Sequence, residues 1–302
     1  MEYTKLLREA YHATFEHKGM WWLGMAVMTG GGIGSQFFSN GVQFIPDVIE
    51  DAGGGSFDEF FADPVWQQWW ADSWWLVVVG LGLLMLLWIV AVLTHLVAQS
   101  GLYYGAEQAR LGKPVQFGTM CVVGLKTIWR YFGFYVLLAC ARFLVGLAFI
   151  VALLTLAASI IGLIMVVPLL LVTVLFSWIV ALLVEVFVVY CLQGMTLRQY
   201  SAWNTFSYAW KMLRQHWLDS ALMAGLVWLI KLGFGLASFF LYLILIVPFA
   251  ILAYVAYTSE AWLMLVLSLA VGSTVILAVW LSLKGMIQSF YAHVWHRVYA
   301  SF

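Results

Sequence analysis

The sequence predicts an all-α membrane protein with six transmembrane helices, arranged as three repeats of an interfacial amphipathic helix plus a helical hairpin. The first observation behind this prediction is composition. Of the 302 residues, 65% are hydrophobic and only 9% are charged, whereas a soluble domain carries roughly 25% charged residues. The second is the presence of several apolar stretches of about 20 residues, the length that crosses a bilayer as a helix. Lipid rather than water is therefore expected to face most of the surface.

Six apolar stretches are long enough to span a membrane. The first is weakened by glycines at 30–32 and 34, and the fifth runs for about 60 Å at 1.5 Å per residue, twice the thickness of the hydrocarbon core. Pro248 is therefore predicted to break the fifth stretch and leave a piece at the outer leaflet. The six stretches are Met20 to about Phe38, Trp74–Ala98, about Phe134–Ala157, about Ile161–Cys191, Leu218 to about Tyr257, and Ala261 to about Ser282.

Charge predicts the orientation of these spans. Cytoplasmic loops accumulate lysine and arginine, and the basic residues outside the spans fall in segments 1–19, 99–133, 192–217 and the tail. Segment 39–73 has no lysine or arginine but several acidic residues. We therefore expect a multi-pass membrane protein with both termini cytoplasmic and 39–73 as a tryptophan-rich extracytoplasmic loop.

Three basic and aromatic segments on the predicted cytoplasmic side resemble one another. They are LLREAYHATFEHKGMWW (6–22), MCVVGLKTIWRYFGFYV (120–136) and TFSYAWKMLRQHWLDSA (205–221). Each is predicted to form an amphipathic helix in the membrane interface, with its apolar face among acyl chains and its cations near phosphates. This pattern divides a single transmembrane domain, residues 1–302, into units of about 1–100, 101–192 and 193–302.

The stretch DPVWQQWWADSWW begins at Asp63 and leads into the second span. Asp63 followed by Pro64 is typical of the start of a helix, and on such a helix four tryptophans share one side. The favoured interpretation is an aromatic belt at the outer headgroup level. A docking face for another membrane subunit and a carbohydrate or quaternary-ammonium site are the alternatives. The four residues are Trp66, Trp69, Trp70 and Trp74.

Three charged residues lie inside predicted spans, where desolvation is costly and function is the default hypothesis. Arg142 and Glu185 fall at similar depth in neighbouring spans, so they are expected to form a buried pair, with Lys231 as a second possible partner. Such a cluster fits an ion or proton relay or a lipid-headgroup site. The alternative is a structural pair, with Lys231 extending toward the interface.

The histidines do not make a complete metal or cofactor site. His293 and His296 are three residues apart, and His12 precedes Glu16 by four, but neither pair has an evident third ligand. His95, near the inner end of the second span, leaves haem or chlorophyll ligation as an alternative to an interfacial role. The chain has no GxSxG, HExxH or CxxC motif, so no enzyme, metal or cofactor is predicted.

The order of these features resembles a group of poorly characterised six-span bacterial inner-membrane proteins. It is also similar to the membrane domain that precedes the catalytic part of some glycerophosphodiester phosphodiesterases. The resemblance covers roughly residues 75–250 and implies a fold and a membrane, not a reaction. It rests on ARLGKPVQFGTMCVVGLKTIWRYF (109–132), VVPLLL (166–171) and LQGMTLRQYSAWNTFSYAWKMLRQHW (192–217).

These observations favour a non-catalytic integral membrane protein. The expected role is that of a structural, accessory or lipid-binding subunit of a membrane complex, and the alternative is a transporter or channel for a small or lipidic substrate. Membrane lipids and other membrane subunits are the expected partners. A formal net charge of zero gives no reason to expect nucleic acid.

Overall fold

The computed structural model describes residues 3–29, 64–157, 180–259 and 261–301, and within this part the chain is helical and contains no strand. The predicted all-α class is confirmed. In chain order the helices are α1 (Tyr3–Glu16), residues 19–29, α4 (Pro64–Arg110), α5 (Phe117–Ala157), Val180–Leu197, α7 (Ala202–Gln215), α8 (Trp217–Thr258) and α9 (Trp262–Ala300).

Within the described residues, five helices are long and apolar enough to cross a membrane. They are α4, α5, Val180–Leu197, α8 and α9, and they make this a multi-pass membrane protein. The first predicted span, Met20 to about Phe38, lies partly outside the described residues, as does the start of the fourth. Six spans in three repeats therefore remain a prediction.

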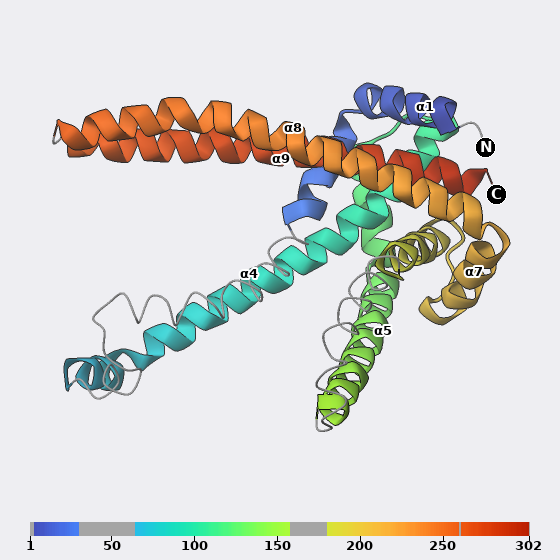
Figure 1. The fold of residues 1–302 in the computed structure, drawn as a ribbon, viewed down its shortest axis with the longest axis horizontal. Coiled ribbons are helices and arrows are strands. Elements are labelled where there is room, and N and C mark those ends of the chain that lie inside the picture. Colours follow the sequence, from blue (N-terminus) through green and yellow to red (C-terminus); the bar gives the residue numbers. More distant parts are fainter. Residues whose placement is uncertain (1–2, 30–63, 158–179, 260, 302) are drawn as a thin grey trace.

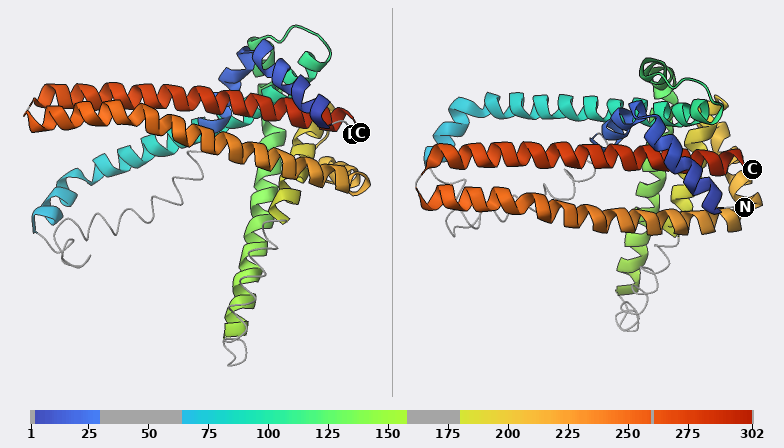
Figure 2. Two further views of the ribbon diagram at one scale, coloured as in Figure 1. Left: turned by 45° about the horizontal axis from the view of Figure 1, so that its top comes forward. Right: turned by 90° about the horizontal axis from the view of Figure 1, so that it is seen from above.

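The long helices meet at one end in a shared core (Figures 1 and 2). We call this core the hub. Helices α4 and α9 enter it with their C-terminal halves, and α5 and α8 enter it with their N-terminal halves, as an up-and-down topology requires. Both chain ends lie beside it (Figure 1). Its buried residues lie within 6–27, 96–106, 120–134, 186–196, 205–213, 220–227 and 287–299.

Beyond the hub, the long helices expose apolar side chains. In the most apolar 18-residue window of α4, and likewise of α8, no residue is buried; Leu263 at the far end of α9 is 75% exposed. Figure 1 shows α4, α5 and the α8–α9 hairpin extending from the hub in different directions. The 42 residues of α8 make about 63 Å of helix, against about 30 Å of hydrocarbon. About half the length of each long helix is thus enough to cross the hydrocarbon core, and the other half packs into the hub.

Glycine permits the closest helix contacts in the hub. A Cβ atom on Gly24 would lie 2.2 Å from the carbonyl oxygen of Gly285, and one on Gly285 would lie 2.5 Å from the carbonyl oxygen of Trp21. Between α4 and α5, a Cβ atom on Gly124 would lie 2.3 Å from the carbonyl oxygen of Val97. Small residues let helix backbones approach in this way, so these contacts fix how residues 19–29 lie on α9 and how α5 lies on α4.

A buried hydroxyl network also holds the hub together. The Tyr131 hydroxyl donates to the Leu192 carbonyl at 3.0 Å and lies 2.6 Å from Thr196 Oγ1. Ser100 Oγ lies 2.5 Å from Thr127 Oγ1 and 3.4 Å from Thr196 Oγ1. The network joins α4 and α5 to the helix that follows them. Since buried polar groups are costly unless paired, it favours one arrangement of these three helices.

Two local predictions are wrong. Pro248 does not break its span, because α8 is continuous from Trp217 to Thr258. The ring of the next residue, Phe249, packs on Gly272 of α9, and α8 continues without the one backbone hydrogen bond that proline removes. Segment 120–136 is not a separate interfacial helix but the start of α5, which contains no proline between Phe117 and Ala157.

The other two repeated segments do form separate amphipathic helices. Helix α1 buries Leu6 and Ala10 along one side. Helix α7 starts at the cap residue Ser201, whose hydroxyl accepts from the Asn204 amide at 3.3 Å. It buries Thr205, Ala209 and Leu213 and leaves Trp203 and Trp210 exposed. Short helices with exposed aromatic residues of this kind suit the membrane interface.

The tryptophan-rich stretch falls at the start of α4, which begins at Pro64 as predicted. It is continuous with the span and is not a separate helix. Trp74 is 53% exposed. Trp66, Trp69 and Trp70 are on the first turns of α4, but their side chains lie outside the described part of the structure, so the choice between belt, docking face and ligand site stays open.

Candidate functional site

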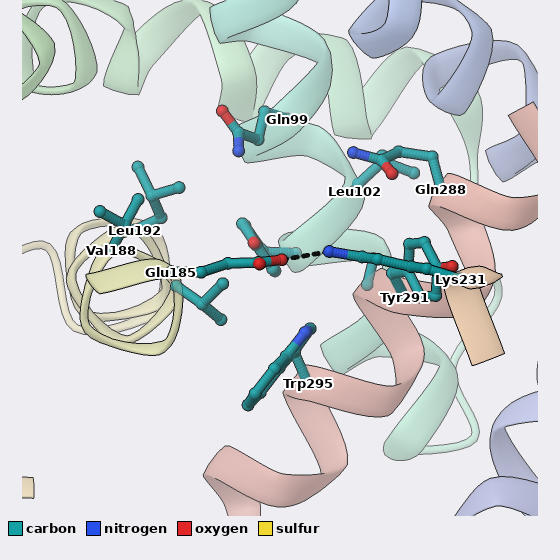
Figure 3. A pocket seen from close by; sticks show the side chains of 12 residues that line it. Gln99, Leu102, Glu185, Val188, Leu192, Lys231, Gln288, Tyr291 and Trp295 are labelled. Carbon is teal, nitrogen blue, oxygen red and sulfur yellow. Dashed lines mark hydrogen bonds and ion pairs between the residues drawn. The ribbon is translucent and has the colours of Figure 1, made fainter. Parts of the chain in front are cut away.

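A cavity of about 170 Å³ lies where the hub gives way to the exposed helices. Four helices line it: α4, Val180–Leu197, α8 and α9. Figure 3 shows an ion pair between Glu185 and Lys231 crossing the space. The two side chains are 44% and 37% exposed respectively, so the charges face the opening of the cavity and are not enclosed by protein. This is the candidate site.

The structure corrects the predicted pairing of the three charged residues within the spans. Glu185 pairs with Lys231, the second partner considered. Arg142 is exposed on α5, two turns beyond the buried part of that helix, and within the described residues it forms no ion pair. Depth along a helix can be counted from sequence, but the side toward which a residue points depends on how the helices pack.

Aromatic and amide side chains complete the site. Lys231 Nζ lies 5.2 Å from the centre of the Tyr291 ring, within the range of a cation–π contact. The Tyr135 hydroxyl donates to Gln99 Oε1 at 2.7 Å, which fixes that amide at the edge of the cavity. In Figure 3 the amides of Gln99 and Gln288 lie on one side of the ion pair, and Trp295 lies on the other.

Sequence reasoning missed these lining residues. Gln99 and Tyr103 are four apart on α4, whereas Gln288, Tyr291 and Trp295 follow one face of α9. These residues could have been noticed in the sequence, because polar and aromatic residues recur at helical spacing near the ends of two spans. That signal becomes specific only when the two helices are known to converge.

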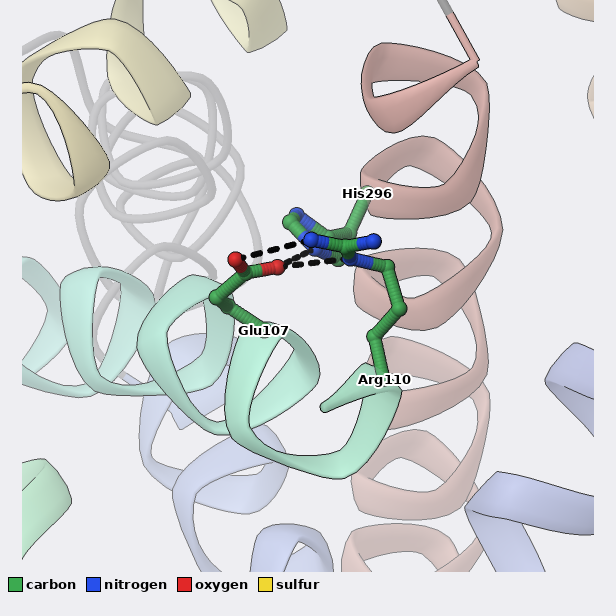
Figure 4. A network of polar contacts seen from close by, with 3 residues as sticks. All are labelled: Glu107, Arg110 and His296. Carbon is green, nitrogen blue, oxygen red and sulfur yellow. Dashed lines mark hydrogen bonds and ion pairs between the residues drawn. The ribbon is translucent and has the colours of Figure 1, made fainter. Parts of the chain in front are cut away.

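A second polar cluster lies at the C-terminal end of α4 and joins that helix to α9 (Figure 4). His296 Nε2 lies 2.6 Å from Glu107 Oε2. Arg110 holds the same carboxylate through Nε at 2.8 Å and Nη2 at 3.0 Å. Carboxylate contacts continue at the hub surface, where Arg297 pairs with Glu9 of α1. These contacts tie α4 to α9 and α9 to α1.

Helix α1 is also tied to α8 through a phenol. The Tyr3 hydroxyl donates to Asp219 Oδ1 at 2.8 Å. This hydrogen bond and the negative charge beside it raise the pKa of the Tyr3 hydroxyl, since both favour the protonated phenol.

His95, which the sequence left as a possible cofactor ligand, has a structural contact. His95 Nδ1 lies 2.6 Å from the Val27 carbonyl oxygen and so donates to it, which holds residues 19–29 against α4. Within the described residues, no three histidine, cysteine, aspartate or glutamate side chains come together in a group suited to a metal ion.

Comparison with known proteins places this architecture in a family. Residues 124–300, more than half of the chain, match DUF7544, a family of unknown function. The chain belongs to this family. The DUF7544 match contains Glu185, Lys231 and the α9 side of the cavity, whereas Gln99 and Tyr103 precede it. No curated protein and no solved structure matches the chain.

Proposed function

We propose that this DUF7544 protein is a non-catalytic, lipid-binding accessory or structural subunit of the cytoplasmic (inner) membrane. The proposal includes a sixth span, Met20 to about Phe38, and a cytoplasmic hub with both termini beside it. It also includes three repeat units, the second of which has its basic and aromatic segment as the start of α5 and not as a separate helix. The observation that carries the proposal is the apolar surface beyond the hub. Side chains such as Met85, Leu144 and Leu263 are more than 60% exposed, and apolar surface on this scale needs a lipid or protein cover.

The polar contacts of the hub support the non-catalytic part of the proposal. Glu107 and His296 hold each other and Arg110, and the hydroxyls around Tyr131 hold neighbouring helices. These groups are used to join elements of the fold. A membrane scaffold needs such a rigid base, from which its spans present their apolar faces to lipids or to other subunits.

A photo-reactive amino acid at exposed span positions tests this proposal. Met85 of α4, Leu144 of α5 and Met264 of α9 are the positions, and buried Val294 of the hub is the control. We expect the span positions to form adducts with lipid or with another membrane protein, identified by mass spectrometry, while position 294 reacts only within the chain. Reaction of the span positions with water alone would contradict the proposal.

The cavity favours a second candidate function, a transporter or channel for a small or lipidic substrate. Charged residues at a cavity between spans are a feature of such proteins. If this candidate is correct, Glu185→Gln abolishes flux in reconstituted vesicles while folding is intact. If the accessory role is correct, the unmodified protein shows no flux, and the same change alters only stability or lipid binding.

A further inference from the structure

The depth of the Glu185–Lys231 pair points to the level of lipid headgroups. Exposed Tyr257 and Trp262 flank the far turn of the α8–α9 hairpin, as aromatic residues do at a membrane interface. About 39 Å of helix separates Lys231 from Tyr257, and the hydrocarbon core takes about 30 Å of it. Lys231 therefore reaches the opposite interface, which begins at the core boundary and is about 5–8 Å thick, and not the bilayer centre.

The cavity offers both signs of charge at this level. Lys231 supplies an ammonium group for a phosphate, and Glu185 supplies a carboxylate for an ammonium group. A ligand that carries both charges can replace the internal pair without leaving either side chain uncompensated. A ligand with a single charge would leave one of them unpaired, which is costly in a partly desolvated site.

The surroundings favour an ammonium group with N–H donors. A carboxylate binds such a group by charge-assisted hydrogen bonds, which a quaternary ammonium cannot donate. One aromatic face of the cavity, that of Tyr291, already lies against Lys231 Nζ. Gln99 and Gln288 at the cavity edge add neutral donors and acceptors for the phosphate oxygens.

The adjoining surface accommodates acyl chains. Outward from Lys231, α8 presents Leu232 and Leu236, which are about half exposed. Given the lipid-binding role proposed above, on which this inference rests, we propose that the cavity binds a phospholipid headgroup containing a phosphate and a primary ammonium, of the phosphoethanolamine type. Lys231 contacts the phosphate, Glu185 contacts the ammonium, and the chains lie along α8.

Native mass spectrometry of the full chain tests this assignment with phosphatidylethanolamine, phosphatidylcholine and phosphatidylglycerol supplied in equal amounts. We expect preferential retention of phosphatidylethanolamine. Glu185→Gln and Lys231→Met should each lower that retention about tenfold or more. Lys126→Met is the matched control, since Lys126 is an exposed cation of α5 outside the cavity, and it should retain the preference. Equal retention of the three lipids by the unmodified protein would overturn the assignment.

A charge-swapped double variant separates lipid binding from a structural pair. Glu185→Lys combined with Lys231→Glu keeps the attraction between the two positions, so thermal stability should recover relative to the single variants. The preference for phosphatidylethanolamine should stay lost, because phosphate and ammonium now meet the wrong partners. Recovery of both stability and lipid preference would show that the pair is only structural and would overturn the assignment.

Soluble phosphoethanolamine distinguishes a lipid from a free zwitterion. It should displace the retained lipid only at high, millimolar concentration, because it lacks the acyl chains. Tight binding of soluble phosphoethanolamine, with no lipid preference, would overturn the lipid assignment. If the photo-reactive span positions still form lipid adducts in that case, only this inference fails and the proposed membrane role stands.

Discussion

Replacing Gly24 with alanine is expected to destabilise the folded protein by about 1–3 kcal/mol or more, the usual cost of forcing atoms into a packed interior. The added Cβ atom would meet the backbone of Gly285 at 2.2 Å. Because the obstacle is main chain, a side-chain rotation cannot relieve it, and residues 19–29 have to move away from α9. Unfolding in an SDS titration, followed by tryptophan fluorescence, measures the change.

Gly80→Ala is the matched control for this substitution. Gly80 also lies within a long helix, but a Cβ atom there has no neighbour within 4 Å. Alanine favours helix over glycine by up to about 1 kcal/mol, so this variant should be as stable as the parent or more stable. Equal effects of the two substitutions would mean that residues 19–29 do not pack on α9 as described.

Substitution of Tyr131 is expected to cause the second large loss of stability. Two variants separate the contribution of the hydroxyl from that of the ring. Tyr131→Phe removes only the hydroxyl that contacts Thr196 and the Leu192 carbonyl, with an expected loss of about 1–3 kcal/mol. Tyr131→Ala also removes a fully buried ring, with an expected loss of about 3–5 kcal/mol. Both are measured by the same SDS titration.

Trp129 provides the comparison on the same helix. Its side chain is 78% exposed, so Trp129→Ala should leave the unfolding transition within about 0.5 kcal/mol of the parent. If Tyr131→Ala is as mild as Trp129→Ala, the hub is not the stable core of the protein, and the spans must be held together by other contacts.

The sequence predicts apolar spans that the structure shows in α4, α5, α8 and α9, because bilayer thickness imposes a local requirement on composition. Most of the apolar run from Trp74 and that from Ala261 lie on single helices, α4 and α9. Hydropathy does not show that these helices continue well beyond the hydrocarbon core, since their buried halves carry tyrosine, glutamine and histidine. The hub was therefore not predicted, although the charge pattern placed its segments on one side of the membrane.

The candidate site, too, could be predicted only in part from the sequence. Glu185 and Lys231 stand out in the sequence as charges in apolar runs, but their pairing depends on how two helices far apart in the chain pack together. The contact between Gly24 and Gly285 cannot be predicted from the sequence either, because a glycine within a span can have several roles. Likewise, the packing of Phe249 on Gly272 of α9, next to Pro248 in the continuous helix α8, depends on a residue far away in the sequence.

We propose that the hub is cytoplasmic and that the exposed half of the α8–α9 hairpin crosses the membrane, with its far turn on the opposite side. Labelling of single cysteines with a membrane-impermeant maleimide tests it directly, in a chain in which Cys121, Cys140 and Cys191 are replaced. Ser259→Cys marks the far turn and Ser301→Cys marks the hub, and both serines are exposed.

In intact cells, position 259 should be labelled from outside, whereas position 301 should react only after the membrane is permeabilised. Labelling of both positions in intact cells, or of position 301 alone, would contradict this account.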